Sequence, residues 1–241
     1  MKKSTAIKYK TIGVLGGMGP SASAYFYQLL LKTLQQKHNA VQDYDYPQII
    51  INSLSLSDSS ENGMESSTRI INQLTKGINA LEKAGANFIT IPCNSVHNSI
   101  KVLRKKTKLP IISIIEKVSL EVIKDKSKKI LILSSKTTNN YGLYDSLKNE
   151  GIIIIKPNSI LEEQVTRLIL AVMGNKNIQN VKKPVIKTIN SMFNSGDIDS
   201  VLLGCTELPL AITKGDVDCK IYDSLRILSE ASVNYSLISA K

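Results

Sequence analysis

The chain has 241 residues, of which 42% are hydrophobic and 21% charged, with 31 lysines and arginines against 20 aspartates and glutamates. This composition excludes a disordered chain, the absence of an apolar run near eighteen residues excludes a transmembrane protein, and the length allows one large core or two modest ones. The basic residues are spread in twos and threes and only 5% of residues are aromatic, so the surplus charge favours solvated faces over a nucleic-acid partner.

Apolar runs typical of strands alternate with amphipathic segments along the whole chain. Strands are predicted at 11–17, 48–54, 88–92, 110–115, 129–135, 152–156, 200–204 and 220–223. Helices are predicted at 20–36, 66–83, 94–106, 116–126, 138–149, 160–173 and on to about 194, with a final helix after 223. Continuously apolar strands that alternate with helices predict an α/β fold with parallel sheets covered on both faces.

A weak internal repeat divides the chain into two similar parts. "KTIGVLGG" at 10–17 is similar to "KKILILSS" at 128–135, and "NFITIPCNS" at 87–95 is similar to "DSVLLGCTE" at 199–207. We therefore expect two pseudo-symmetric α/β halves. The predicted N-terminal half comprises 1–113 plus 219–241, and the predicted C-terminal half comprises 114–218.

Each half carries a cysteine just beyond the apolar run of one strand. Cys93 occurs in "IPCNSVH" and Cys205 in "LLGCTEL". Ligand crevices of open α/β sheets lie outside the carboxyl ends of the strands, so the two thiols are expected to face one cleft between the halves. There, one thiolate can remove a proton from a carbon acid while the opposite thiol delivers one to the other face, which inverts the stereocentre.

The remaining cysteine and the two histidines give weaker indications of function. Cys219 has no partner pattern and is interpreted as structural. Three cysteines without CxxC pairs argue against a disulfide framework and a zinc ribbon, and only two histidines, His38 and His97, make a metal site improbable. His97 lies four residues after Cys93, where it could tune the thiolate or form a nucleophilic pair; a cap of its own helical turn is an equally weighted alternative.

Three further segments have more than one interpretation. Gly17-x-Gly19-x-x-Ala22 is a loose dinucleotide fingerprint, but the second strand ends in Asn52 and Ser53 and lacks the acidic residue that a dinucleotide site needs. The serine-rich stretch 52–67 is a solvated loop or, as we prefer, a mobile lid. The N-terminal residues lead straight into a glycine turn, which is not a signal peptide, so a cytoplasmic protein is expected.

Three stretches together carry a family resemblance: "IGVLGGMGPSASAYFYQLL", "GANFITIPCNSVHNSI" and "LLGCTELPL". They resemble the aspartate/glutamate racemase superfamily, closest to its aspartate racemase branch. The resemblance implies flavodoxin-like halves with the active site between them and amino-acid racemisation without pyridoxal phosphate, another cofactor or a metal. It also implies a homodimer that acts on a small-molecule amino acid, without nucleic acid or membrane, and makes Cys93 and Cys205 the acid/base pair.

The resemblance also implies which residues bind the substrate. They are Met18, Gly19, Ser53, Asn94, Ser95, Thr137 and Thr206. One departure concerns the substrate side chain, because Ser59 stands where aspartate racemases have an arginine. Val172 falls near a second family position, a lysine that Lys136 or Lys176 could replace. Aspartate is the expected substrate; the alternatives are glutamate or another amino acid, a non-catalytic amino-acid-binding protein, and a decarboxylase or isomerase of the same superfamily.

Overall fold

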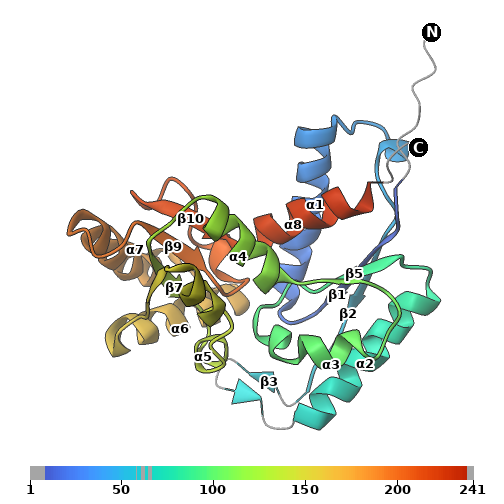
Figure 1. The fold of residues 1–241 in the computed structure, drawn as a ribbon, viewed down its shortest axis with the longest axis horizontal. Coiled ribbons are helices and arrows are strands. Elements are labelled where there is room, and N and C mark those ends of the chain that lie inside the picture. Colours follow the sequence, from blue (N-terminus) through green and yellow to red (C-terminus); the bar gives the residue numbers. More distant parts are fainter. Residues whose placement is uncertain (1–8, 58, 61–62, 65–66, 238–241) are drawn as a thin grey trace.

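Two four-stranded parallel sheets form the frame of the molecule. The computed structural model describes residues 9–57, 59–60, 63–64 and 67–237. The first sheet has the order β2-β1-β5-β6, with β1 (Ile12–Gly16), β2 (Ile49–Ser53), β5 (Phe88–Thr90) and β6 (Ile111–Ile112). The second has the order β10-β9-β7-β8, with β7 (Lys129–Leu133), β8 (Ile153–Ile155), β9 (Ser200–Leu203) and β10 (Lys220–Asp223). The predicted α/β class is confirmed (Figure 1).

The two sheets have the same topology. In each, the strand that comes first in the chain lies between the second and the third, and the fourth lies at an edge. β1 pairs with β2 and β5, as β7 pairs with β8 and β9, all in parallel. The sequence repeat therefore reflects two halves of the same plan.

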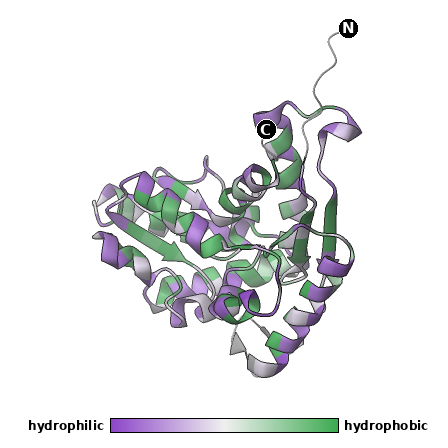
Figure 2. Cartoon of the chain, turned by 45° about the vertical axis from the view of Figure 1, so that its right-hand side comes forward, coloured by the Kyte–Doolittle hydropathy of each residue, from purple (hydrophilic) through white to green (hydrophobic). Residues whose placement is uncertain are grey.

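Helices cover both sheets. The α-helices are α1 (Pro20–His38), α2 (Ser67–Lys83), α3 (Ile100–Arg104), α4 (Ile114–Lys124), α5 (Lys136–Asn140), α6 (Ser159–Met173), α7 (Gln179–Asn194) and α8 (Ser224–Ser236). Shorter 3₁₀ turns are η1 (Asp43–Asp45), η2 (Ser95–Ser99), η3 (Asp145–Glu150) and η4 (Leu208–Leu210). Figure 2 shows the strands as hydrophobic and the helices with hydrophilic outward faces, as buried parallel sheets require.

Three predicted segments differ from those observed. The helix expected at 94–106 consists of the 3₁₀ turn η2 followed by the short helix α3. The helix expected at 138–149 is split into α5 and η3, because Gly142 between them takes a φ of 56° that ends the helical run. Within the predicted lid 52–67, β3 (Ser59–Ser60) pairs antiparallel with β4 (Gly63–Met64). This hairpin lies near α5 of the second half (Figure 1). Asp58, which precedes Ser59 in this stretch, lies outside the described residues.

The last helix crosses back to the first half. α8 follows β10 of the second sheet, yet it packs along α1. The Thr33 and Ser229 hydroxyls are 2.9 Å apart, and Ser232 donates to the Thr90 hydroxyl of β5 at 3.1 Å. α4, which follows β6 of the first sheet, packs along α8 and also contacts η3. The proposed division into 1–113 plus 219–241 and 114–218 assigns β10 and α8 to the same half. In the structure, β10 belongs to the second sheet, whereas α8 covers the first.

One hydrophobic core joins the two halves. A single cluster of buried side chains contains Ile12 and Phe88 of the first sheet, Ile130 and Leu202 of the second, and Leu228 of α8. Two further clusters fill the outer faces, one in each half. The two halves therefore share one core and are not separate domains joined only by a linker.

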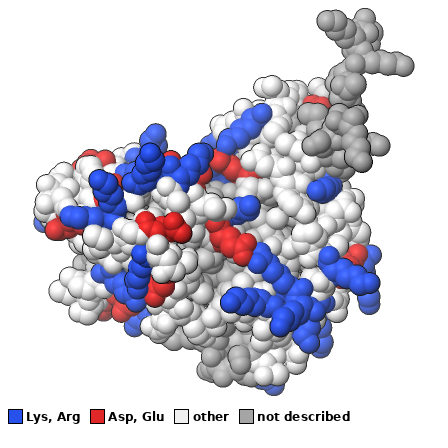
Figure 3. Space-filling view, viewed as in Figure 1, with Lys and Arg blue, Asp and Glu red and all other residues white. Residues whose placement is uncertain are grey.

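The surface carries its charge in separate groups. Figure 3 shows lysines and arginines gathered in several places with acidic side chains between them. No helix among the described residues has the length and hydrophobicity to span a bilayer.

Candidate active site

Cys93 lies in a small cleft beyond the carboxyl end of β5. Its side chain is largely buried, and its Sγ is 3.4 Å from the Ser95 hydroxyl. The cleft encloses about 130 Å³, well under the size of drug-binding pockets, which suits a single amino acid rather than a dinucleotide. Its lining consists of Gly17, Met18, Gly19, Pro20, Leu56, Cys93, Ser95, Ser135, Thr137 and Met173.

The turn between β1 and α1 forms one wall of this cleft and needs its glycines. Gly17 has a φ of 93°, and a Cβ there would lie 2.1 Å from the Leu54 carbonyl oxygen. A Cβ on Gly19 would lie 2.8 Å from Oε1 of Glu207. The glycines thus allow the backbone to approach neighbouring groups closely. The segment that loosely matches the dinucleotide fingerprint is a turn that borders a small cleft.

Cys205 follows β9 at the position equivalent to Cys93 but does not itself line the cleft. Its thiol donates to Oε2 of Glu207 at 3.1 Å, and the Thr206 hydroxyl donates to the same oxygen at 3.2 Å. Oε1 of Glu207 accepts from the Gly19 backbone N–H at 3.2 Å. This buried carboxylate therefore links the second thiol to the wall of the cleft across the two halves.

Thr137 presents a free polar atom to the cleft. It lies in the first turn of α5, and its hydroxyl is buried without a hydrogen-bond partner among the described residues. Buried polar atoms are almost always paired, so an orphan that borders a cleft points to a ligand contact. Ser135 beside it caps α5 and also lines the cleft.

The Asn94 side chain belongs to a buried hydrogen-bond network. Its side-chain oxygen accepts from the Tyr144 hydroxyl at 2.5 Å, and its amide nitrogen donates to the Ser224 hydroxyl at 3.3 Å. Ser224 in turn donates to the Leu203 carbonyl at 2.7 Å. The side chain that the resemblance assigns to substrate is thus engaged in a buried network that ties β5 of the first half to the second half.

His97 is a structural histidine by its contacts. Its Nε2 accepts from the Ile114 N–H at 3.2 Å, so its Nδ1 carries the proton and donates to the Cys93 carbonyl at 2.8 Å. Burial, assisted by the charge of Arg104, lowers the pKa of His97 to about 4, so the ring is neutral near pH 7. Both nitrogens are used by backbone groups, which favours the capping interpretation over a Cys/His pair.

The other expected residues are divided between the cleft and its surroundings. Met18, Gly19, Ser95 and Thr137 line it with Cys93. Ser53 ends β2 on an exposed surface, and Thr206 is buried against Glu207.

Several residues of the site were not named as candidate site residues from the sequence. Leu56, Ser135 and Met173 line the cleft, and Glu207 holds the second thiol. Ser135 could have been found, because it occupies the same place as Gly17 in the two repeat segments. Leu56 falls within the predicted lid 52–67 but was not named as a site residue. Met173 carried no signal, since an isolated apolar residue has no recognisable motif.

The charged groups near the cleft are few. None of the described residues that line it is charged. Lys136 adjoins the lining residues Ser135 and Thr137, and Lys176 lies close to Gly174, next to Met173. Among the described residues, no group of three or more His, Cys, Asp and Glu is placed to hold a metal ion.

Fold and site define a class: an α/β protein of two like halves with a thiol in a cleft sized for an amino acid. The pattern of the Asp/Glu/hydantoin racemase family matches residues 15–231. The chain belongs to this family. It is therefore an isomerase, an amino-acid racemase of a family that works without pyridoxal phosphate.

Individual relatives agree with this membership. A broad-specificity amino-acid racemase of Bacillus subtilis (strain 168) is 26% identical over 92% of this chain and 96% of its own. The structure of an aspartate racemase homologue from Pyrococcus horikoshii OT3 is 31% identical with a TM-score of 0.79, over 93% of this chain and 98% of that one. An aspartate racemase from Picrophilus torridus shares the fold, at 24% identity and a TM-score of 0.80 over 93% of both chains.

Proposed function

We propose that the protein interconverts the L and D forms of a free amino acid by proton transfer at Cα between Cys93 and Cys205. The observation that carries this proposal is the equivalent placement of the two thiols beyond β5 and β9, one in the cleft and the other linked to its wall through Glu207. A binding protein without catalysis would have no use for a second thiol at the equivalent position.

The two thiols have different surroundings, which suggests different resting roles. Cys205 donates to an oxygen of the Glu207 carboxyl group, an arrangement that suits a thiol acting as the proton donor. Cys93 has a hydroxyl neighbour, Ser95, that can donate to a thiolate. In this mechanism Cys93 as thiolate removes the Cα proton and the Cys205 thiol protonates the opposite face; the reverse reaction exchanges the roles.

The side-chain preference is proposed on two observations that point in different directions. Likeness to an aspartate racemase homologue supports aspartate, with Lys136 or Lys176 as the cation that would replace the family arginine. The described lining residues carry no charge and include Met18, Leu56 and Met173, which supports a neutral side chain instead. Aspartate stays our first candidate, and a neutral amino acid is the second.

The test is solvent deuterium incorporation at Cα, measured by NMR with purified protein and no added cofactor. The panel holds L and D aspartate, glutamate, alanine and methionine. Exchange with inversion on aspartate supports the first candidate, and exchange on alanine or methionine alone supports the second. No exchange on any amino acid of a wider panel would contradict the proposed function.

A further inference from the structure

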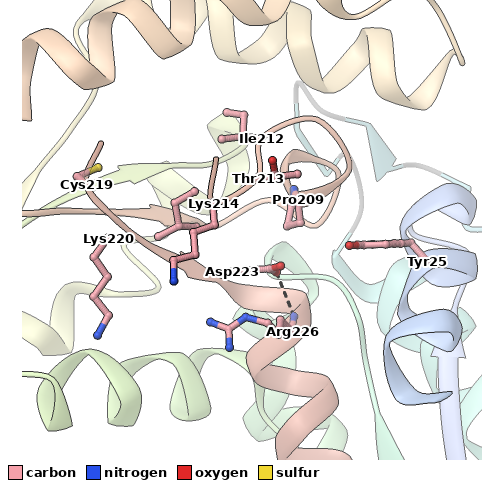
Figure 4. A pocket seen from close by; sticks show the side chains of 10 residues that line it. Tyr25, Pro209, Ile212, Thr213, Lys214, Cys219, Lys220, Asp223 and Arg226 are labelled. Carbon is pink, nitrogen blue, oxygen red and sulfur yellow. Dashed lines mark hydrogen bonds between the residues drawn. The ribbon is translucent and has the colours of Figure 1, made fainter. Parts of the chain in front are cut away.

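A second hollow, larger than the cleft, lies between the two halves away from the two motif cysteines. It encloses about 500 Å³, within the range of small-molecule sites. Tyr25 of α1 forms one side, η4 and the loop after it another, and β10 and the start of α8 the rest (Figure 4). We call it the basic pocket, because Lys214, Lys220 and Arg226 line it.

The positive charge of the basic pocket is only partly neutralised. Lys220 pairs with Asp125 and Arg226 with Glu230, two acids that lie outside the lining. Lys214 makes no ion pair or hydrogen bond with any described residue. Three cations therefore border one space, and one of them has no ion pair with the described part of the chain, which favours a ligand with more than one negative charge.

One carboxylate, that of Asp223, also lines the basic pocket, but it caps a helix. Asp223 accepts from the Arg226 backbone N–H at 3.0 Å, as the N-cap of α8. In Figure 4 its side chain lies on the side of Tyr25, whereas the Lys214, Lys220 and Arg226 nitrogens lie together on the other side. The anionic group of a ligand and Asp223 would thus occupy different ends of the pocket.

The remaining lining is suited to a planar or apolar body. Pro209, Ile212 and Ile221 contribute apolar surface, and the Tyr25 ring contributes an aromatic one. The enclosed space is also several times that of the cleft, so a single amino acid would leave most of it empty. The preferred ligand therefore combines a compact multiply charged group with a ring.

We propose that the basic pocket binds a phosphate monoester that carries a planar ring, of the chemical class of the nucleoside monophosphates, with the phosphate on Lys214, Lys220 and Arg226 and the ring against Tyr25, Pro209 and Ile212. Guanidinium and ammonium donors match phosphate oxygens, whereas a single carboxylate would satisfy fewer of them. Binding is independent of the racemase reaction.

The experiment is isothermal titration calorimetry with adenosine 5′-monophosphate, with adenosine and inorganic phosphate as separate arms. The variants are Lys214→Gln/Arg226→Gln and, as a matched control with the same loss of charge, Lys183→Gln/Lys187→Gln on the exposed face of α7. We expect the monophosphate to bind the unaltered protein with a Kd of about 1 mM or tighter, and the pocket variant to bind at least about tenfold more weakly. The control variant should bind like the unaltered protein.

The arms separate the two parts of the ligand. Adenosine and phosphate should each bind more weakly than the monophosphate, and the monophosphate should raise the Tm of the unaltered protein. Equal affinity in the pocket and control variants, or no saturable binding by the unaltered protein, would overturn the proposal. Phosphate that binds as tightly as the monophosphate would overturn the assignment of the ring. Because binding is measured without turnover, neither result depends on whether racemisation is observed.

Discussion

At the scale of single residues, the two thiols are the first to test. Cys93→Ala and Cys205→Ala should each lower racemisation by at least about 10³-fold, because each removes one of the two proton-transfer groups. Cys→Ser variants should fail as well, since a hydroxyl is a far weaker base than a thiolate near neutral pH. Turnover is followed by polarimetry. A single variant with near-normal turnover would contradict the two-thiol mechanism, provided that circular dichroism shows an intact fold.

Glu207 should set the pH range of the reaction. Activity needs one thiolate and one thiol, so kcat/KM is expected to be bell-shaped against pH. Glu207→Gln replaces the carboxylate acceptor of the Cys205 thiol with an amide, and the alkaline limb should move to lower pH.

The control for this variant is Ser95→Ala, which alters the neighbour of Cys93 only and should leave the alkaline limb in place. Lower activity of Glu207→Gln at every pH, without a moved limb, would mean that Glu207 serves only to join Cys205 to Gly19.

His97 should make stability depend on pH. Its pKa is lowered from 6.5 to about 4 by burial, so the unfolded chain binds the additional proton between these values. Unfolding therefore becomes easier as pH falls from about 6.5 to about 4, by about 3 kcal/mol in all. Urea unfolding at several pH values measures this, and His97→Gln should show a shallower dependence. Parallel curves for both proteins would show that His97 is not the source.

At the scale of elements, the network around Asn94 joins the halves. Tyr144→Phe removes the donor to the Asn94 side chain and leaves a buried oxygen unpaired, which should lower the free energy of unfolding by about 1–3 kcal/mol. Tyr141→Phe, on an exposed tyrosine nearby, is the control and should be neutral. Urea unfolding gives both values, and equal stability of the two variants would show that this bond is not important.

The elements also show what the sequence could predict. The order of strands and helices followed from apolar periodicity, and Cys93 was placed in a cleft because strand ends are where α/β proteins bind ligands. The engagement of Asn94 by Tyr144 and Ser224 could not be foreseen, because the three residues come from three distant segments. Glu207 follows Cys205 closely in the sequence, but its hydrogen bond with the Gly19 N–H depends on how the two halves fold together.

At the scale of the whole molecule, the shared core should make unfolding a single event. Side chains of both sheets and of α8 belong to one buried cluster, so neither half can lose its packing alone. Calorimetry should show one transition with a calorimetric to van't Hoff enthalpy ratio near one. Two resolved transitions would contradict this expectation. The predicted homodimer is a separate matter, measured by light scattering.

The return of α8 to the first half also bears on how the chain can be made. On the ribosome, the strands of the first sheet emerge long before residues 224–236, with the whole second half in between. At ordinary elongation rates this interval is on the order of ten seconds. During that time the face of the first sheet that α8 later covers is exposed to solvent. We therefore expect a nascent chain of this protein to bind chaperones until α8 has been translated.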